Sequence, residues 1–505
     1  MEADGAAAAS AAAQPQPRRY YVRVVLLGSA GQGVLLERLG DSWDLPFFAY
    51  PSQVAIQQVC DDVRRALAPD SAYFIVNCNL IGISPYLGRP PTKDVGVANL
   101  LLMECQGHVL QASGPYSWRD TAFVDQLLKS GVKDWGAEKA LEIVSKLLCR
   151  DPERLVAFLV DPRFLKGWFD KASARLTTFI ASTGAIVRGR VVQVHVSFSS
   201  SVLKVESSTG VFYLKAVAIG SKEAKVTQKV ASLFPEDAPA VEMLDLDLNC
   251  FVSRAFTPTL AGAEFSTYAQ LLGRLQMRSI KHLDDLRAVG VPDCGPEQLA
   301  KELRKWVDLK EDDATVYPAT ATLPVHASDA DIVRIWCGDV RKYARFVKYV
   351  PFLLQLCNRL ASGSIPLTLV HGDVGRRNTG LSASDGASRP ILFDWEFACI
   401  GHPFYDWHEL HFAVPEEVRL SYLRLFTKYG AQSDLEPLYD AGRTLGWCVK
   451  MYHMLKRARL CDVELFSTHR LVFLDSWELL IESLMDVRLP LGVPQDEGPK
   501  WRYLT

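Results

Sequence analysis

One stretch, His371–Asp406, constrains the fold more than any other part of the chain. It is fed by Leu367–Val370, an apolar run that predicts a buried strand and leads into a His-Gly-Asp turn ending at Asp373. Further on, Ile391–Phe393 predicts a second short strand, and Asp394 stands at its end. The sequence therefore predicts two carboxylates at neighbouring strand ends.

An amide side chain completes this set, because Asn378 follows Asp373 by five positions. The segment between Asn378 and the second strand is rich in Ser, Asp and Gly, which predicts a polar loop. Phosphoryl transfer requires a carboxylate that orients a hydroxyl and accepts its proton. It also requires oxygen ligands that hold Mg²⁺ on the nucleotide phosphates. Asp373, Asn378 and Asp394 are the residue types that this chemistry needs.

The spacing of these residues resembles the aminoglycoside phosphotransferase and choline kinase family, which shares the protein-kinase fold. The continuation DWEFACIGHPFYD, ending at Asp406, is similar to that family as well. The resemblance implies that Asp373 is the catalytic base and that Asn378 and Asp394 bind Mg²⁺, with ATP as co-substrate. It also implies that His371 and Asp406 support the catalytic loop. The alternative is a coincidental His-Gly-Asp turn in an ordinary α/β domain.

Arg376 and Arg377 depart from the usual wording of the family in this turn. A guanidinium beside the transferring phosphoryl group stabilises charge in a transition state. The alternative is that both side chains face solvent or pair with a nearby carboxylate.

A lysine inside an apolar strand is the second informative feature. Lys215 lies within Val211–Ala218, and an unpaired ammonium buried in such a strand is costly. The resemblance implies that Lys215 contacts the ATP phosphates. It also implies a pair with Glu223, which falls in the first turn of the predicted helix Ser221–Leu233. A surface salt bridge is the alternative for both residues.

The resemblance implies a small, β-rich lobe over residues 164–256, in which Ser199–Ser201 occupy the place of the phosphate-covering loop. A helical lobe over residues 257–490 and a tail over 491–505 follow. The fold class that the resemblance implies is α+β, a two-lobed kinase-like fold. The small lobe contains a helix at Phe164–Ala181 and strands at Arg190–Ser197, Val202–Glu206, Val241–Leu246 and Cys250–Phe256. Helices of the large lobe are expected at Glu264–Met277, Pro296–Val307, Ala330–Tyr349, Pro351–Leu360, Glu417–Tyr429, Glu436–Arg457 and Val463–Leu484.

Aromatic and polar side chains recur in the last part of the large lobe. Such side chains cage a cationic amine by cation–π contacts, although aromatics at helical spacing more often form a core. His408 and His453 are expected to have no metal-binding companions and to be structural. The residues in question are Trp407, Trp447, Tyr452, His453, Asp475 and Trp477.

The amino-terminal part predicts a disordered tail over residues 1–19, a small α/β domain over 20–150 and a linker over 151–163. Tyr21–Leu27 and Val34–Glu37 flank a glycine-rich turn that suits a hairpin better than a phosphate loop. The remaining expected elements are strands at Ala72–Cys78 and Gly96–Glu104, and helices at Gln53–Leu67, Trp118–Leu128 and Ala137–Leu148.

This domain faintly resembles a Nudix domain, through Trp43-Asp44-Leu45-Pro46 after the hairpin and the helix that follows. Gln57, Gln58, Asp61 and Asp62 stand where that family places its Arg and Glu residues. The resemblance implies a degenerate domain that has lost pyrophosphatase chemistry and serves as a scaffold or binding module. Two alternatives remain: an unrelated α/β domain, and a hydrolase for which Asp61 and Asp62 suffice.

Composition narrows the cellular context. The 56 basic and 58 acidic side chains nearly balance, so neither nucleic acid nor an anionic membrane is an expected partner. The 11 cysteines include no CxxC pair, which argues against a disulfide framework or a zinc site. Neither a signal peptide nor a transmembrane run is recognised, and the expected location is cytoplasmic.

Two hypotheses follow. The first is a Mg²⁺- and ATP-dependent kinase that phosphorylates a hydroxyl of a small molecule of the aminoglycoside, choline or amino-alcohol class. Its partners are that substrate and ATP. The second is a catalytically inactive, kinase-like nucleotide-binding or scaffold protein, whose amino-terminal domain binds a protein partner.

Overall fold

The computed structural model divides the chain into two compact units. The first comprises Met1–Phe74 and Leu80–Leu148, and the second comprises Ile75–Asn79 and Cys149–Thr505. Across both units the structure describes residues 20–27, 34–39, 42–44, 47–50, 73–80, 97–106, 116–130, 161–164, 167–197, 199–258, 265–307, 328–337, 340–384, 387–410, 414–458, 473–481 and 483.

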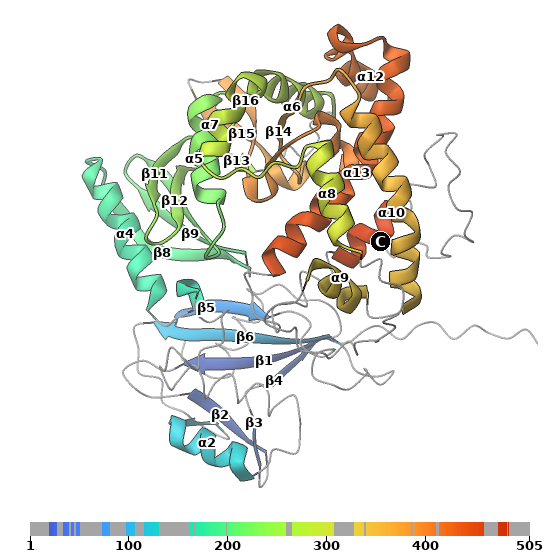
Figure 1. Ribbon diagram of the computed structural model, residues 1–505. Coiled ribbons are helices and arrows are strands. Elements are labelled where there is room, and N and C mark those ends of the chain that lie inside the picture. The colour runs from blue at the N-terminus through green and yellow to red at the C-terminus, as the bar shows by residue number, and fades with distance from the viewer. Residues whose placement is uncertain are drawn as a thin grey trace, which may run out of the picture. The chain divides into compact units, whose positions relative to one another are not determined.

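A seven-stranded sheet with the order β3-β2-β1-β6-β5 lies in the amino-terminal region, with β4 on β1 and β7 on β2 (Figure 1). The pair β1–β6 is parallel, whereas β2 and β4 run antiparallel to β1. The elements are β1 (Tyr20–Leu27), β2 (Val34–Leu39), β3 (Ser42–Asp44), β4 (Phe47–Tyr50), β5 (Tyr73–Leu80), β6 (Val97–Gln106), β7 (Tyr116–Arg119) and α2 (Thr121–Ser130).

The predicted hairpin is present, because Leu27 of β1 pairs with Val34 of β2 in an antiparallel register. The predicted helix Trp118–Leu128 is wrong at its start: Trp118 lies in β7, opposite Leu35 of β2. The helix begins only after Asp120, whose Oδ1 accepts a hydrogen bond of 2.9 Å from a backbone N–H of the first turn. Cross-strand pairing therefore overrides the helical spacing here.

The Nudix-like helix lies outside the described residues. This applies to Gln57, Gln58, Asp61 and Asp62, and also to the expected helix Ala137–Leu148. The Nudix resemblance stays a prediction.

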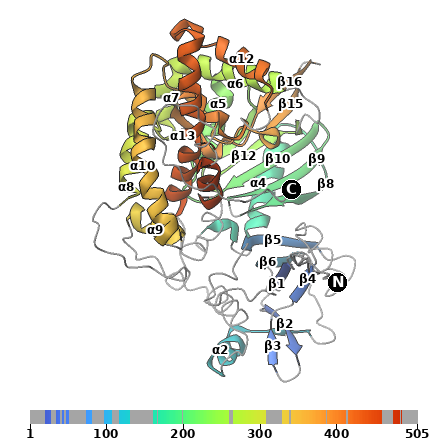
Figure 2. The ribbon, with the colours of Figure 1, turned by 90° about the vertical axis from the view of Figure 1, so that its right-hand side faces the viewer.

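The second unit begins with a small lobe built on an antiparallel sheet with the order β11-β12-β10-β9-β8, accompanied by α4 and α5 (Figures 1 and 2). Its elements are η3 (Pro162–Phe164), α4 (Trp168–Ser182), β8 (Val187–Val196), β9 (Ser200–Ser207), β10 (Gly210–Val217), α5 (Glu223–Leu233), β11 (Val241–Asp245) and β12 (Cys250–Arg254).

Helices dominate the rest of this unit, and they pack around a buried cluster that includes Trp306, Trp336 and Phe346. They are α6 (Phe265–Ser279), η4 (Ile280–His282), α7 (Leu283–Ala288), α8 (Pro296–Lys305), α9 (Asp329–Cys337), α10 (Val340–Ala361), η5 (Arg376–Asn378), η6 (Trp395–Phe397), η7 (Pro403–Asp406), α11 (Trp407–Leu410), α12 (Glu416–Arg424), η8 (Thr427–Tyr429) and α13 (Gln432–Ala458). Residues 473–481 are helical as well. The predicted two-lobed α+β fold is confirmed.

Pro351 corrects one predicted boundary. The sequence predicts a new helix at this residue, but Pro351 lies inside the continuous helix α10. The neighbouring Tyr349, Val350, Phe352 and Leu353 are all buried. Because packing holds the helix on both sides of the proline, the missing N–H does not end it.

Two small sheets hold the segment that carries the predicted site. One has the order β13-β15-β16 and the other pairs β14 with β17. The polar loop predicted after Asn378 is therefore wrong: β15 and β16 form a hairpin, with Thr379 opposite Leu392. Asp385-Gly386 is the sequence signal for a hairpin that could have revealed it. The strands are β13 (Thr257–Pro258), β14 (Thr368–Val370), β15 (Thr379–Ser384), β16 (Ala387–Leu392) and β17 (Cys399–Gly401).

The two lobes are joined by two ion pairs that share one buried carboxylate. The carboxylate of Asp237, which follows α5, is fully buried and lies 2.6 Å from Arg274 Nη2 and 2.8 Å from Arg278 Nη1 of α6. Its backbone oxygen also accepts a hydrogen bond of 2.8 Å from the N–H of Leu392 in β16. Asp237 therefore connects the small lobe to both a helix and a strand of the large lobe.

We expect Asp237→Asn to lower the free energy of unfolding by about 1.5–3 kcal/mol, because it weakens hydrogen bonds between charged groups at a buried position. Urea denaturation followed by circular dichroism measures this change. Asp284→Asn is the matched control, since Asp284 pairs with Arg287 but its side chain is 99% exposed. The control should change stability by less than about 1 kcal/mol. Equal losses of stability in Asp237→Asn and Asp284→Asn would contradict the role of Asp237 in joining the two lobes.

Candidate active site

Lys215 lies between two carboxylates from different lobes. It is in the middle of β10, where Val202 and Phe251 flank it on the neighbouring strands. Its Nζ lies 2.5 Å from Oε1 of Glu223 in α5 and 2.8 Å from Oδ1 of Asp394. The strand lysine therefore finds the acidic partner in α5 that the sequence suggested, and a second one from the large lobe.

Lys215 and Asp394 are partly buried and hold each other ionised, whereas the fully buried Glu223 has a pKa raised to about 7. Burial by itself lowers the pKa of Lys215, but Glu223 and Asp394 outweigh it and the pKa rises well above its ordinary value. Burial raises the pKa of Glu223, although Lys215 opposes this shift. At Asp394 the same lysine outweighs the effect of burial and lowers the pKa. The ammonium is thus the fixed charge of the cluster.

The hairpin β15–β16 brings Asn378 and Asp394 to its open end. Asn378 immediately precedes β15, and Asp394 follows β16 by one intervening residue. The N–H of that residue, Phe393, donates a hydrogen bond of 3.0 Å to the backbone oxygen of Asn378. Asp394 itself adopts a left-handed conformation, with φ of 70°, that directs the chain away from the strand.

Asn378 also contacts Asp373. Its Nδ2 donates to Oδ2 of Asp373 at 2.7 Å and to the backbone oxygen of Asp373 at 2.8 Å. These two bonds fix the orientation of the amide, so that its side-chain oxygen faces away from Asp373. The side-chain pairs Asp373–Asn378 and Lys215–Asp394 are therefore joined through the backbone hydrogen bond between Phe393 and Asn378.

A buried carboxylate holds the turn in front of Asp373. Asp406 is fully buried, and it accepts hydrogen bonds from the backbone N–H groups of His371 at 3.1 Å and Gly372 at 2.8 Å. Burial raises the pKa of Asp406, while His371 and these backbone N–H groups lower it. Because both N–H groups point at one side chain, the turn has little freedom to move.

Gln276 is a part of this network that the sequence analysis missed. Its Nε2 donates to Oδ2 of Asp406 and to the backbone oxygen of Pro403, both at 2.9 Å. The hydroxyl of Tyr422 donates to the side-chain oxygen of Gln276 at 2.5 Å. A fully buried glutamine in the amphipathic helix α6 gave no motif, and only its burial reveals its role.

His371 links the two halves of the site. Its Nε2 lies 2.9 Å from the backbone oxygen of Phe393, so this nitrogen carries the proton and donates it. The imidazole also packs against Trp395, with ring centroids 4.5 Å apart. His371 therefore fixes the distance between the turn at Asp373 and the segment that begins at Asp394.

Lys450 is the second residue that the sequence analysis missed. It comes from α13, and its Nζ lies 3.1 Å from Oδ1 of Asp373. Burial raises the pKa of Asp373, but Lys450 outweighs it and holds the pKa below the ordinary value. The signal was available: Lys450 interrupts a buried apolar stretch of a helix, as Lys215 interrupts an apolar strand.

The burial of side chains bears on two interpretations from the sequence: the role of Arg376 and Arg377, and the aromatic cage. The side chain of Arg377 is exposed, whereas that of Arg376 lies outside the described side chains. Trp407, Trp447 and Trp477 are buried in the hydrophobic core, which favours the packing interpretation over an aromatic cage. Asp475 carries a pKa raised by burial.

Comparison with known families now identifies the second unit. Residues 193–443 match the model of the phosphotransferase enzyme family. This part of the chain belongs to that family. The match covers both lobes of the unit, from β8 to α13, and includes every residue of the cluster around Asp373 except Lys450. No curated protein matches the chain.

Solved structures with a similar arrangement include three kinases of small molecules. Macrolide 2'-phosphotransferase MphH from Brachybacterium faecium is 13% identical, and the match covers 60% of this chain and 98% of that one, with a TM-score of 0.38. The Plasmodium vivax ethanolamine kinase is 10% identical, and the match covers 71% of this chain and 94% of that one, with a TM-score of 0.40. The choline kinase LicA from Streptococcus pneumoniae is 11% identical, and the match covers 62% of this chain and 99% of that one, with a TM-score of 0.39.

No helix in the described part of the chain is long and apolar enough to cross a membrane.

The turn at Gly372 gives a test of how tightly the site is built. Gly372 has φ of +80°, and a Cβ at this position would lie 2.4 Å from the backbone oxygen of Phe397. We expect Gly372→Ala to destabilise the protein more than Gly189→Ala. Gly189 is the matched control, because its φ is +75° but a Cβ added there would meet nothing within 4 Å.

The free energy of unfolding of the control Gly189→Ala should fall by about 1–2 kcal/mol through backbone strain alone. Chemical denaturation of both variants measures the difference. Equal losses would show that the close approach between Gly372 and Phe397 carries no constraint.

Proposed function

We propose that this protein is a Mg²⁺- and ATP-dependent phosphotransferase that phosphorylates a hydroxyl group of a small molecule, of the aminoglycoside, choline or amino-alcohol class. The observation that carries the proposal is the pairing of Lys215 with Asp394 across the two lobes, joined through the backbone to the pair Asp373–Asn378. The match of residues 193–443 to the phosphotransferase enzyme family supports the same reaction class.

In this proposal Asp373 orients the acceptor hydroxyl and accepts its proton. The hydroxyl oxygen forms a new bond to the γ-phosphorus, and the bond from that phosphorus to the β–γ bridging oxygen breaks, leaving ADP. Because Lys450 lowers the pKa of Asp373, the carboxylate is ionised before substrate binds and is a weak base. It therefore acts mainly by orientation, with proton transfer late, as a loose phosphoryl-transfer transition state requires.

The donor set fits Mg²⁺. Asn378 and Asp394 offer an amide oxygen and a carboxylate, which are the hard oxygen ligands that this ion prefers. The hydrogen bonds from Nδ2 of Asn378 to Asp373 leave the amide oxygen as its ligand atom. The bound ion supplies charge neutralisation on the nucleotide phosphates. Lys215 supplies a second positive charge there, held in place by Glu223.

Lys450 extends this proposal beyond the residues expected from the sequence. Its ammonium is beside the atom that accepts the proton, at 3.1 Å from Oδ1 of Asp373. In this position it keeps the carboxylate ionised and restricts its rotation. We propose that Lys450 is a positioning residue for Asp373.

The function is tested first through nucleotide binding. We expect Mg-ATP at a hundred times its dissociation constant to stabilise the wild type by about 2.7 kcal/mol, measured by thermal denaturation. Asp394→Asn should lose the Mg²⁺-dependent part of this stabilisation and all phosphate transfer, because it removes a charged ligand. Asp284→Asn, an exposed carboxylate in the same unit, is the control and should behave as wild type. Turnover by Asp394→Asn would overturn the assignment.

The pH dependence tests the role of Lys450. Lys450 favours the ionised form of Asp373, so its removal raises the pKa of that carboxyl. We expect Lys450→Met to move the acidic limb of kcat/KM to higher pH and to lower kcat. Lys450→Arg, which retains the charge, should leave the limb close to its wild-type position. An unchanged limb in Lys450→Met would exclude this role.

A further inference from the structure

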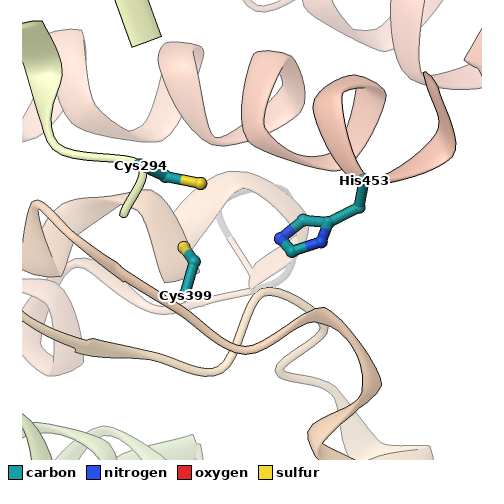
Figure 3. Close-up of side chains that lie close together, drawn as sticks. All are labelled: Cys294, Cys399 and His453. Carbon is teal, nitrogen blue, oxygen red and sulfur yellow. The ribbon is translucent and has the colours of Figure 1, made fainter. Parts of the chain in front are cut away.

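Three side chains with metal-binding atoms meet inside the large lobe, and the proposed phosphoryl transfer uses none of them. They are Cys294, which lies just before α8, Cys399 at the start of β17, and His453 in α13. Their ligand atoms all lie within 4.8 Å of one another. Figure 3 shows the two thiols and the imidazole pointing toward a common centre.

This group corrects an expectation from the sequence. His453 was expected to have no metal-binding companions, and that is wrong, because Cys294 and Cys399 lie beside it. The three residues are far apart in the chain and none belongs to a CxxC pair. Only the packing of α13 against β17 and the segment before α8 brings them together.

Burial makes this group more than a chance contact. Cys294 and Cys399 are 2% and 0% exposed, and His453 is 8% exposed. Nε2 of His453 is buried without a hydrogen-bond partner among the described residues. A ring nitrogen of His453 faces the two sulfur atoms in Figure 3. An unpaired buried nitrogen is costly, and a metal ion at the common centre would satisfy it.

We propose that Cys294, Cys399 and His453 form a zinc site. Two thiolates and one imidazole are a donor set that Zn²⁺ binds in proteins, with the fourth position left to another ligand. With zinc–sulfur distances of about 2.3 Å, a tetrahedral ion would hold the two sulfurs about 3.8 Å apart. The ligand atoms lie within 4.8 Å of one another, so the side chains would draw together around a bound ion.

The charge of the site favours a divalent ion. Two thiolates and a neutral imidazole cancel the charge of Zn²⁺, so the loaded site carries no net charge into the protein interior. A monovalent ion such as Cu⁺ would leave one negative charge in the protein interior.

The group contains three metal-binding residues within the described part of the chain, which leaves the fourth position of a tetrahedral ion to a water molecule.

The site would connect three segments that build the candidate active site. Cys399 pairs with Val370, the residue before His371, in the sheet β14–β17. The N–H of Cys294 donates to the backbone oxygen of Ile400 at 2.7 Å. His453 lies in α13, one turn after Lys450. Zinc would therefore brace the catalytic turn and α13 from behind, without taking part in phosphoryl transfer.

The test uses the full-length protein, purified under reducing conditions, incubated with Zn²⁺ and dialysed. We expect about one zinc per chain by elemental analysis, and a rise in Tm that a strong chelator reverses. Replacement by Co²⁺ should give the intense visible bands of a tetrahedral site together with thiolate charge-transfer absorption. Binding of Mg-ATP is measured separately, so a failure of the proposed function does not affect this result.

Two variants remove ligands and one serves as control. Cys399→Ala removes a thiolate, and His453→Phe removes the nitrogen but retains a ring for packing against Phe397. Both should lose stoichiometric zinc and the zinc-dependent rise in Tm. Cys357→Ala, which alters a buried free cysteine outside the group, should retain both. If Cys399→Ala does not fold, His453→Phe carries the test alone.

The proposal is overturned by wild-type protein that holds no stoichiometric zinc after incubation. Retention of zinc by His453→Phe with wild-type affinity would also overturn it. A disulfide between Cys294 and Cys399 in the reduced preparation, mapped by mass spectrometry and unaffected by Zn²⁺, would show that the thiols serve another purpose.

Discussion

The contact of one ammonium with two carboxylates is the interaction on which the candidate site depends. Lys215 arises from a strand of the small lobe, Glu223 from the helix beside it, and Asp394 from the large lobe. A partly buried lysine in an apolar strand is stabilised by such partners. The lysine needs a negatively charged partner, and Asp394, the proposed metal ligand, is one of the two that it finds. The ion pair that stabilises the fold therefore also assembles the site.

The large lobe supports this contact with a buried polar network rather than with apolar packing alone. Asp406 holds the backbone of the turn before Asp373, and Gln276 and Tyr422 hold Asp406. Each member is buried and hydrogen-bonded, which is the condition under which polar networks make a structure rigid. Since Mg²⁺ tolerates little geometric error, a rigid turn beside its proposed ligands has a direct chemical purpose.

Helix α13 joins the two proposals. Lys450, His453 and Arg457 are spaced by three and four residues, which places them on one face of a helix. Lys450 contacts Asp373, His453 joins the two cysteines, and Arg457 lies 2.5 Å from Oε1 of Glu396. A zinc ion bound to His453 would fix the position of α13. Lys450 and Arg457 on the same face of this helix would then be held against Asp373 and Glu396.

The sequence by itself determined the two-lobed fold and the residues of the motif, because Asp373, Asn378 and Asp394 lie within one short stretch and Lys215 breaks an apolar strand. Local spacing is enough for such features. Only the tertiary structure decided that β15–β16 is a hairpin, that Pro351 lies within a helix, and that Gln276, Lys450 and the Cys294–Cys399–His453 group reach their partners. These contacts join residues distant in the chain, and their side chains form no local pattern until packing fixes the neighbours.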